Sequence, residues 1–169
     1  KSWQKVLGVQ EWHPDTPVLY TLRTELIRGG QVIDVLDTRF GFREAVFKKD
    51  GFYLYGHKFK LRGLNHHQSY PYVGYAMPES MQKYDAEILK KELGVNAVRT
   101  SHYPQSQHFI NACDELGLLV FTEIPGWQHI GDEAWKQVAM KNTEEMVLQY
   151  RNHPSVILWG VRINESMDD

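Results

Sequence analysis

The sequence has little cysteine, little net charge and no long hydrophobic run. Among its 169 residues the one cysteine, Cys113, excludes an internal disulfide framework and a zinc cluster built from several cysteines. Lysine and arginine total 19 against 21 aspartate and glutamate. This near balance lacks the excess of positive charge that binds nucleic acid or an anionic membrane. Apolar stretches stay well short of the roughly 20 residues that a membrane helix needs. We therefore expect neither nucleic acid nor a membrane as a partner.

The ends of the sequence carry no targeting signal that we can recognise. Residue 1 is Lys, and no charged segment followed by an apolar one stands near it, so we read no signal peptide. The sequence stops at Asp169, soon after a strongly apolar stretch. We expect the chain to be an internal piece of a longer protein, and the compartment stays unknown.

The first 44 residues are typical of β-structure. Residues 18–28 alternate between apolar and polar, Gly29-Gly30 is a two-residue hairpin signal, and residues 31–42 return as a second strand. This pattern predicts the last strands of an antiparallel sandwich. Residues 45–60 then form a bridge that contains a short hairpin.

Beyond this bridge the pattern changes to alternating strands and helices. Helical spacing and end signals predict three helices, at residues 80–93, 105–116 and 132–152. Apolar runs predict four strands, at residues 61–65, 95–100, 118–122 and 156–163. Alternation of this kind favours right-handed crossovers and a parallel sheet, so the fold class is α/β.

Polar side chains follow each of the four predicted strands, where chemistry gathers in parallel βα folds. They are Asn65, His66 and His67; Arg99 and His102; Glu123, Trp127 and His129; and Asn164 and Glu165. Burial at the end of an apolar strand would raise the pKa of Glu165 and suit it to proton donation. Asn164 can bond a hydroxyl group, and aromatic rings can cover the apolar face of a sugar. This combination suits glycoside chemistry.

Two other classes stay open. His66, His67, His102, Glu123 and His129 could be ligands of a metal-dependent hydrolase. However, neighbouring residues of a strand face opposite ways, so at most one of His66 and His67 enters a site, and zinc-binding spacings are absent from the sequence. A carbohydrate-binding protein without activity is the second alternative. Cys113 lies within a predicted helix and is read as a buried structural thiol.

Three segments resemble glycoside hydrolase family 2, the β-galactosidase and β-glucuronidase family. Residues 61–67 (LRGLNHH) resemble its first barrel strand, and residues 96–104 (NAVRTSHYP) are similar to its second-strand motif. Residues 151–159 (RNHPSVILW) followed by Asn164-Glu165-Ser166 resemble the region of its acid/base glutamate. Residues 12–20 and 40–43 are similar to the end of its immunoglobulin-like sandwich.

The resemblance implies the N-terminal half of a (β/α)8 TIM barrel (residues 45–169), preceded by the C-terminal part of an immunoglobulin-like β-sandwich (residues 1–44). It implies a retaining exo-β-glycosidase acting on terminal β-D-galactosides, with β-glucuronidase or β-mannosidase as alternatives. Glu165 matches the general acid/base and Asn164 the residue that bonds the sugar 2-hydroxyl. His67, His102, Arg99, Trp127 and His129 would bind substrate, with Glu123 and Asn65 supporting them. Arg99 would hold active-site carboxylates by bidentate bonding, and Arg62 matches a strand arginine that suits a structural role equally well.

The chain also departs from the family pattern. One extra residue separates Trp159 from Asn164, and we expect a β-bulge to absorb it. Magnesium-binding members carry Glu where Trp127 stands, so we expect no cofactor here; His129 and Glu165 are the residues that could contribute to a metal site. The family's nucleophile, a second Glu, is absent from this chain. The chain alone should therefore be inactive, and its open barrel edges should favour self-association or a homo-oligomer.

Overall fold

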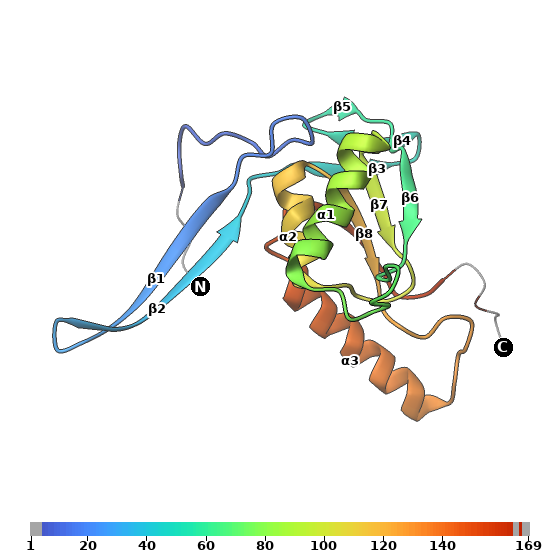
Figure 1. Ribbon diagram of the computed structural model, residues 1–169. Coiled ribbons are helices and arrows are strands. Elements are labelled where there is room, and N and C mark those ends of the chain that lie inside the picture. Colours follow the sequence, from blue (N-terminus) through green and yellow to red (C-terminus); the bar gives the residue numbers. More distant parts are fainter. Residues whose placement is uncertain (1–4, 164–165, 167–169) are drawn as a thin grey trace.

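The computed structural model describes residues 5–163 and residue 166. Its strands form three sheets, and a pair of strands projects from the rest of the molecule (Figure 1). This projecting hairpin consists of β1 (Tyr20–Arg28) and β2 (Gln31–Phe40). Gly29 and Gly30 both have positive φ, as the tight turn between the strands requires, so the predicted hairpin is confirmed. The second strand ends at Phe40, two residues earlier than predicted.

A small antiparallel sheet forms the bridge. It consists of β3 (Ala45–Lys48), β4 (Gly51–Leu54) and β5 (His57–Lys58), so it contains one strand more than the predicted hairpin. Figure 1 places this sheet next to the end at which the strands of the parallel sheet, described below, begin. Phe52 and Leu54 join Trp12, Leu119 and Ile157 in a buried cluster, which closes that end of the parallel sheet. Each fully buried side chain of this size contributes about 1.5–3 kcal/mol.

Four parallel strands in sequential order form the third sheet. They are β6 (Gly63–His66), β7 (Ala97–Thr100), β8 (Leu119–Glu123) and β9 (Val156–Gly160). The helices α1 (Glu79–Glu87), α2 (Gln107–Leu116) and α3 (Glu133–Tyr150) connect them, and α1 continues as the π-helical turn η1 (Ile88–Glu92). The predicted parallel α/β arrangement is confirmed.

The helices lie against one face of this sheet (Figure 1), and Val98, Val120 and Val156 pack beneath them. Ser106 and Asp132 cap α2 and α3 by accepting bonds from the main-chain N–H groups of His108 and Trp135. These caps place the helix starts at residues 107 and 133, rather than at the predicted residues 105 and 132. Cys113 is fully buried in α2, and burial raises the pKa of its thiol, as a structural role predicts.

The segment before the hairpin is tied to the helical layer. The indole N–H of Trp12 donates to the carbonyl oxygen of Asp114 at 2.8 Å. Lys90 donates to the carbonyl oxygens of Pro14 and Gly117, at 2.9 and 3.0 Å. A Cβ on Gly117 would lie only 2.1 Å from the oxygen of Pro14, and Gly117 also has a left-handed φ of 74°. Only glycine fits at this contact.

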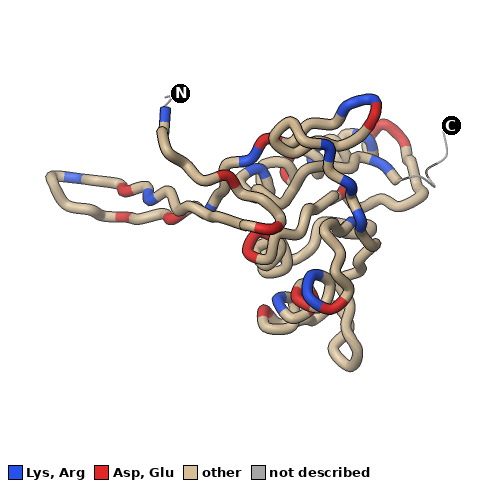
Figure 2. Tube along the Cα trace, turned by 90° about the horizontal axis from the view of Figure 1, so that it is seen from above, with Lys and Arg blue, Asp and Glu red and all other residues tan. Residues whose placement is uncertain are grey.

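The surface of the described chain carries both signs of charge. Figure 2 shows Lys and Arg interspersed with Asp and Glu along the hairpin and over the rest of the molecule. Within the described residues, none of the helices combines the length and apolar character needed to span a membrane.

Candidate active site

Several of the predicted rim residues lie where the parallel strands end. His66 is the last residue of β6 and His67 follows it, while Glu123 is the last residue of β8. His102 lies just after β7. Asn164 and Glu165, predicted to follow β9, lie outside the described residues.

Glu123 is the centre of the polar network at this rim. Its side chain has no exposed surface, and its carboxylate accepts bonds from two neighbours. The Nδ1–H of His102 donates to Oε1 at 2.8 Å, while Nε and Nη2 of Arg99 donate to Oε2 at 3.2 and 2.9 Å. An ionised carboxylate only accepts, so His102 carries a proton on Nδ1 and leaves Nε2 for another partner. These bonds therefore hold the side chains of Arg99 and His102 in place.

Arg99 does not bind its carboxylate in the expected fork geometry. Both of its nitrogen donors meet the single oxygen Oε2, because His102 occupies Oε1. Its guanidinium also lies over the ring of Phe121, 5.4 Å from the centroid. Asn65 pairs with Arg99 in the strand register, and both residues line a cavity on the inner face of the sheet. Asn65 thus lies beside the Glu123 network.

Aromatic and imidazole rings form a surface next to this network. The ring of His102 lies 5.5 Å from that of His67 and 5.4 Å from that of Trp127. Tyr103 adds a ring 6.0 Å from His67, and Tyr75 lies 6.4 Å from Tyr103. These five side chains make up what we call the rim surface. Flat apolar faces beside hydrogen-bonding groups are what a sugar ring requires.

The two tyrosines were not among the predicted site residues. Tyr103 stands within the second-strand motif, which was the available signal, whereas Tyr75 comes from the long loop after β6. The hydroxyl oxygen of Tyr103 accepts a bond from the main-chain N–H of Gln68 at 3.1 Å. Burial raises the pKa of Tyr103 above its ordinary value, so the phenol stays neutral at physiological pH.

The neighbouring side chains of His66, the last residue of β6, and His67, which follows it, separate as predicted. His67 joins the rim surface, whereas the ring of His66 turns to the helix side and stacks on Phe109. Arg62 precedes β6 at the opposite end of the strand, where its N–H donates to Asn96, so it lies away from the rim. His66 and Arg62 are therefore structural neighbours of the site rather than members of it.

The strand that leads to Glu165 differs in detail from the prediction. β9 ends at Gly160 rather than at residue 163, and Val161 and Arg162 form a bend. An irregularity does occur in β9, but it lies earlier: Val120 and Phe121 of β8 pair with Val156 and Leu158, which leaves Ile157 between them. The described residues between Trp159 and Asn164 thus contain a bend and not the expected bulge.

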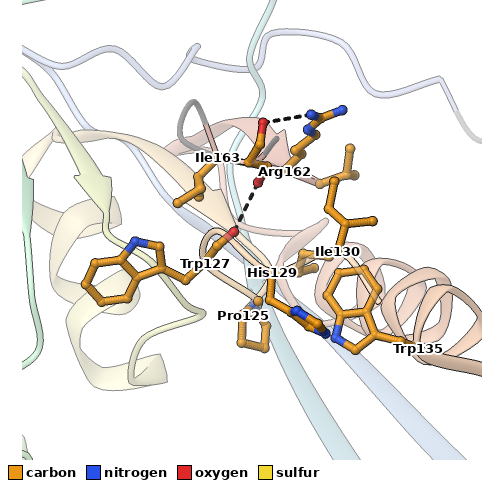
Figure 3. Close-up of a pocket in the computed structure, with 11 residues that line it drawn as sticks. Pro125, Trp127, His129, Ile130, Trp135, Arg162 and Ile163 are labelled. Atoms are coloured by element: carbon orange, nitrogen blue, oxygen red, sulfur yellow. Dashed lines mark hydrogen bonds between the residues drawn. The ribbon is translucent and has the colours of Figure 1, made fainter. Parts of the chain in front are cut away.

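The segment after β9 is joined to the loop that follows β8. The hydroxyl of Ser166 donates to the carbonyl oxygen of Trp127 at 3.0 Å, and Arg162 donates to the carbonyl oxygen of Ser166 at 2.8 Å. Both bonds are drawn as dashed lines in Figure 3, where Trp127 and Arg162 are labelled. Trp127 has a positive φ of 49°, a conformation uncommon outside glycine. This connection places Ser166 next to Trp127 of the rim surface.

His129 lies apart from the histidines of the rim. Its ring packs edge-on against Trp135 at the start of α3, 5.7 Å between centroids, and Figure 3 shows the side chain of Trp127 pointing away from this pair. No three His, Cys, Asp or Glu side chains of the described residues come together as metal ligands would. Of the two residues that could contribute to a metal site, His129 packs against Trp135, and Glu165 lies outside the described residues. The role of His129 in binding substrate stays a prediction.

Comparison with protein-family models matches almost all of the chain. The model for the TIM barrel domain of glycosyl hydrolases family 2 matches residues 45–169, and the model described as glycosyl hydrolases family 2 matches residues 4–43. The chain belongs to glycoside hydrolase family 2. Its four parallel strands with their helices are accordingly the N-terminal half of a TIM barrel, which confirms the predicted fold.

Individual members of family 2 are also similar. A β-galactosidase of Thermoanaerobacterium thermosulfurigenes is 64% identical over 98% of this chain and 23% of its own length. A β-galactosidase of Thermoanaerobacter pseudethanolicus is 58% identical over 94% of the chain and 21% of its length. The solved structure of Bacteroides uniformis β-glucuronidase 3 has a TM-score of 0.84 and 42% identity, covering 92% of the chain and 20% of its own. The chain thus spans about a fifth of these family 2 proteins.

Proposed function

We propose that the chain is part of a retaining exo-β-glycosidase that hydrolyses terminal β-D-galactosides. The observation that carries the proposal is the network in which buried Glu123 holds Arg99 and His102 beside His67 and Trp127. Such a site offers oriented donors and flat faces at the rim where TIM-barrel enzymes act. The choice of galactosides rests on the 64% identity to a β-galactosidase.

Glu165 is the proposed general acid/base, and Asn164 the proposed partner of the sugar 2-hydroxyl. Protonation of the departing oxygen by Glu165 lets the aglycone leave as a neutral alcohol, and the same group later takes a proton from water. His67 and His102 would bond sugar hydroxyls, and Nε2 of His102 is the ring nitrogen that its bond to Glu123 leaves available. Trp127 would cover one face of the ring.

Retaining hydrolysis needs a second carboxylate, about 5–5.5 Å from the acid/base. Glu123 is unsuited to this task because both of its oxygens already accept bonds from Arg99 and His102. The nucleophile is therefore assigned to a part of the intact protein beyond this chain. No cofactor is needed for this reaction, and we propose none.

The leaving group provides the sharpest test of the role of Glu165. In the intact protein, Glu165→Gln should lower kcat/KM, which reports the step in which the aglycone leaves, by about 10²–10⁴-fold for lactose, because a sugar alkoxide leaves poorly without a proton. Hydrolysis of a dinitrophenyl β-D-galactoside should suffer much less, since this aglycone departs as a stable anion. Equal losses on both substrates would remove Glu165 from the acid role.

A β-glucuronidase is the second candidate, favoured by the 42% identity to a solved structure of that activity. Side-by-side assay of nitrophenyl β-D-galactoside, glucuronide and mannoside with the intact protein decides among the sugars. Galactose binding in calorimetry without turnover of any of the three would instead indicate a carbohydrate-binding relative that lost its activity.

A further inference from the structure

His66 makes a polar contact through each of its ring nitrogens although its side chain is 8% exposed. Its Nδ1 lies 2.7 Å from Oε1 of Gln105, and its Nε2 lies 2.5 Å from Oδ2 of Asp85 in α1. The ring stacks on Phe109 of α2, with centroids 4.4 Å apart and planes 3° from parallel. These contacts join the end of β6 to the helices α1 and α2.

The orientation of the Gln105 amide is fixed by a second contact. Its Nε2 lies 2.6 Å from the main-chain oxygen of His66, and a carbonyl oxygen can only accept. The amide nitrogen must therefore face that carbonyl, which leaves the amide oxygen facing Nδ1 of His66. Nδ1 consequently has to carry a proton.

Nε2 of His66 meets a carboxylate rather than a donor. A proton must lie between Nε2 and Asp85, since two bare acceptors 2.5 Å apart would repel each other. A proton on the ring at this position gives His66 a donor on both nitrogens, and each donor then faces an oxygen acceptor. We propose that His66 is held as an imidazolium paired with Asp85, and that this pair is a positioning device for the site residue His67.

Two other titratable side chains of the described residues near the pair are neutral. Cys113 in α2 faces Asp85, but burial raises the pKa of its thiol, which stays neutral. Tyr150 of α3 donates to the main-chain oxygen of Gln105 at 2.6 Å, and burial raises its pKa to about 12, so it is neutral too. A buried ion pair is retained most readily where it fixes a geometry.

That geometry leads directly to the rim surface. The carbonyl oxygen of His66 accepts from Gln105 and also from the N–H of Ser101, at 3.0 Å, next to His102. Both the side chain and the main chain of His66 are thus fixed, and the backbone that carries His67 starts from this fixed point. The proposal rests on the proposed function, in which His67 bonds the sugar.

Substitutions in the intact protein test the charge of His66 separately from its volume. His66→Gln should lower kcat/KM for nitrophenyl β-D-galactoside about tenfold or more, because displacement of a site residue by about 1 Å is costly. His66→Lys restores a cation with several donors and should recover to within about threefold of the wild type. The matched control is His108→Gln, since His108 is 49% exposed and lies 3.6 Å from Glu79.

The variant Asp85→Asn tests the other member of the pair by removing its negative charge. It should lower kcat/KM as His66→Gln does and change the alkaline limb of the pH profile, which a purely packing role would not move. Nitrogen NMR of histidine-labelled protein, assigned through the His66→Gln variant, should show both ring nitrogens protonated at pH 7. A neutral His66 ring, or equal activity of His66→Gln and His66→Lys, would overturn the proposal.

An intact wild type that hydrolyses no glycoside would refute the proposed function instead. The NMR result alone would then decide whether His66 and Asp85 form an ion pair.

Discussion

The Nδ1 atom of His102 lies 2.8 Å from Oε1 of Glu123, a carboxylate with no exposed surface. This contact fixes both the orientation of the imidazole and which ring nitrogen carries the proton. Because Arg99 holds the other oxygen of the same carboxylate, one buried group sets the position of two rim side chains.

Replacement of Glu123 by Gln should lower both activity and stability. The amide cannot accept from His102 and Arg99 at once, so the imidazole turns, and we expect kcat/KM to fall by about 10–100-fold. Loss of the charge opposite Arg99 should cost about 3 kcal/mol of folding stability. Kinetics and urea unfolding of the intact protein measure both, with Glu87→Gln in the exposed pair with Lys91 as the control. Normal kinetics in a destabilised variant would reduce Glu123 to a folding role.

Trp127 should contribute to binding rather than to folding. Its side chain is 58% exposed while its ring lies 5.4 Å from that of His102, so little core packing is lost on truncation. We expect Trp127→Ala to raise KM about tenfold with a small change in Tm, and Trp127→Phe to keep most of the affinity by retaining a flat face. Steady-state kinetics and thermal melting provide the comparison. An unchanged KM in the alanine variant would separate Trp127 from the sugar site.

The sequence predicted the strand and helix order because hydrophobic period and end signals agree in this chain. Gly29, Gly30 and Gly117 all have positive φ. Glycine is the residue that adopts this conformation most readily, so the residue type by itself predicted these turns. The sequence did not predict which face of α1 is buried. Gln82 and Ala86 are buried, and the neighbouring Asp85 pairs with His66, which lies in a strand far from it in the sequence. The contacts of Tyr75 with the rim likewise depend on the path of a long loop, which has no periodic signal.

The chain should lose stability in strong alkali. Burial raises the pKa of Tyr150 to about 12, above the ordinary value near 10, so folding favours the neutral phenol. The contribution is therefore fully present below pH 10 and is lost as the pH rises through about 12. Urea midpoints of the intact protein at pH 8 to 11.5 should fall above pH 10. Tyr150→Phe should be less stable at pH 8, having lost the bond to Gln105, and should fall less steeply. An equally steep fall in that variant would assign the alkaline loss to other groups.

The 169-residue chain alone should not hydrolyse glycosides. It supplies the proposed acid/base Glu165 but no second carboxylate that the described structure leaves available at the rim. An assay of the purified chain with an aryl β-galactoside should give no turnover above the background of the Glu165→Gln chain. Turnover abolished by that substitution would contradict the prediction and place a nucleophile within these residues.

Self-association of the isolated chain is expected for a different reason. Within the described part, β6 pairs only with β7 and β9 only with β8, so each presents an unpaired strand edge. Leu64 is 47% exposed on the first of these edges. Exposed edges recruit further strands, so light scattering should report dimers or larger species that dissociate on dilution. A clean monomer at high concentration would show that both edges are protected.

The contact between Gly117 and Pro14 has a consequence for engineering. A methyl group at residue 117 would clash with the main-chain oxygen of Pro14. The segment that precedes the hairpin is therefore matched to the turn after α2 at the level of single atoms. Chimeras that graft an N-terminal region from another family 2 protein onto this half-barrel will have to carry over both sides of that contact together.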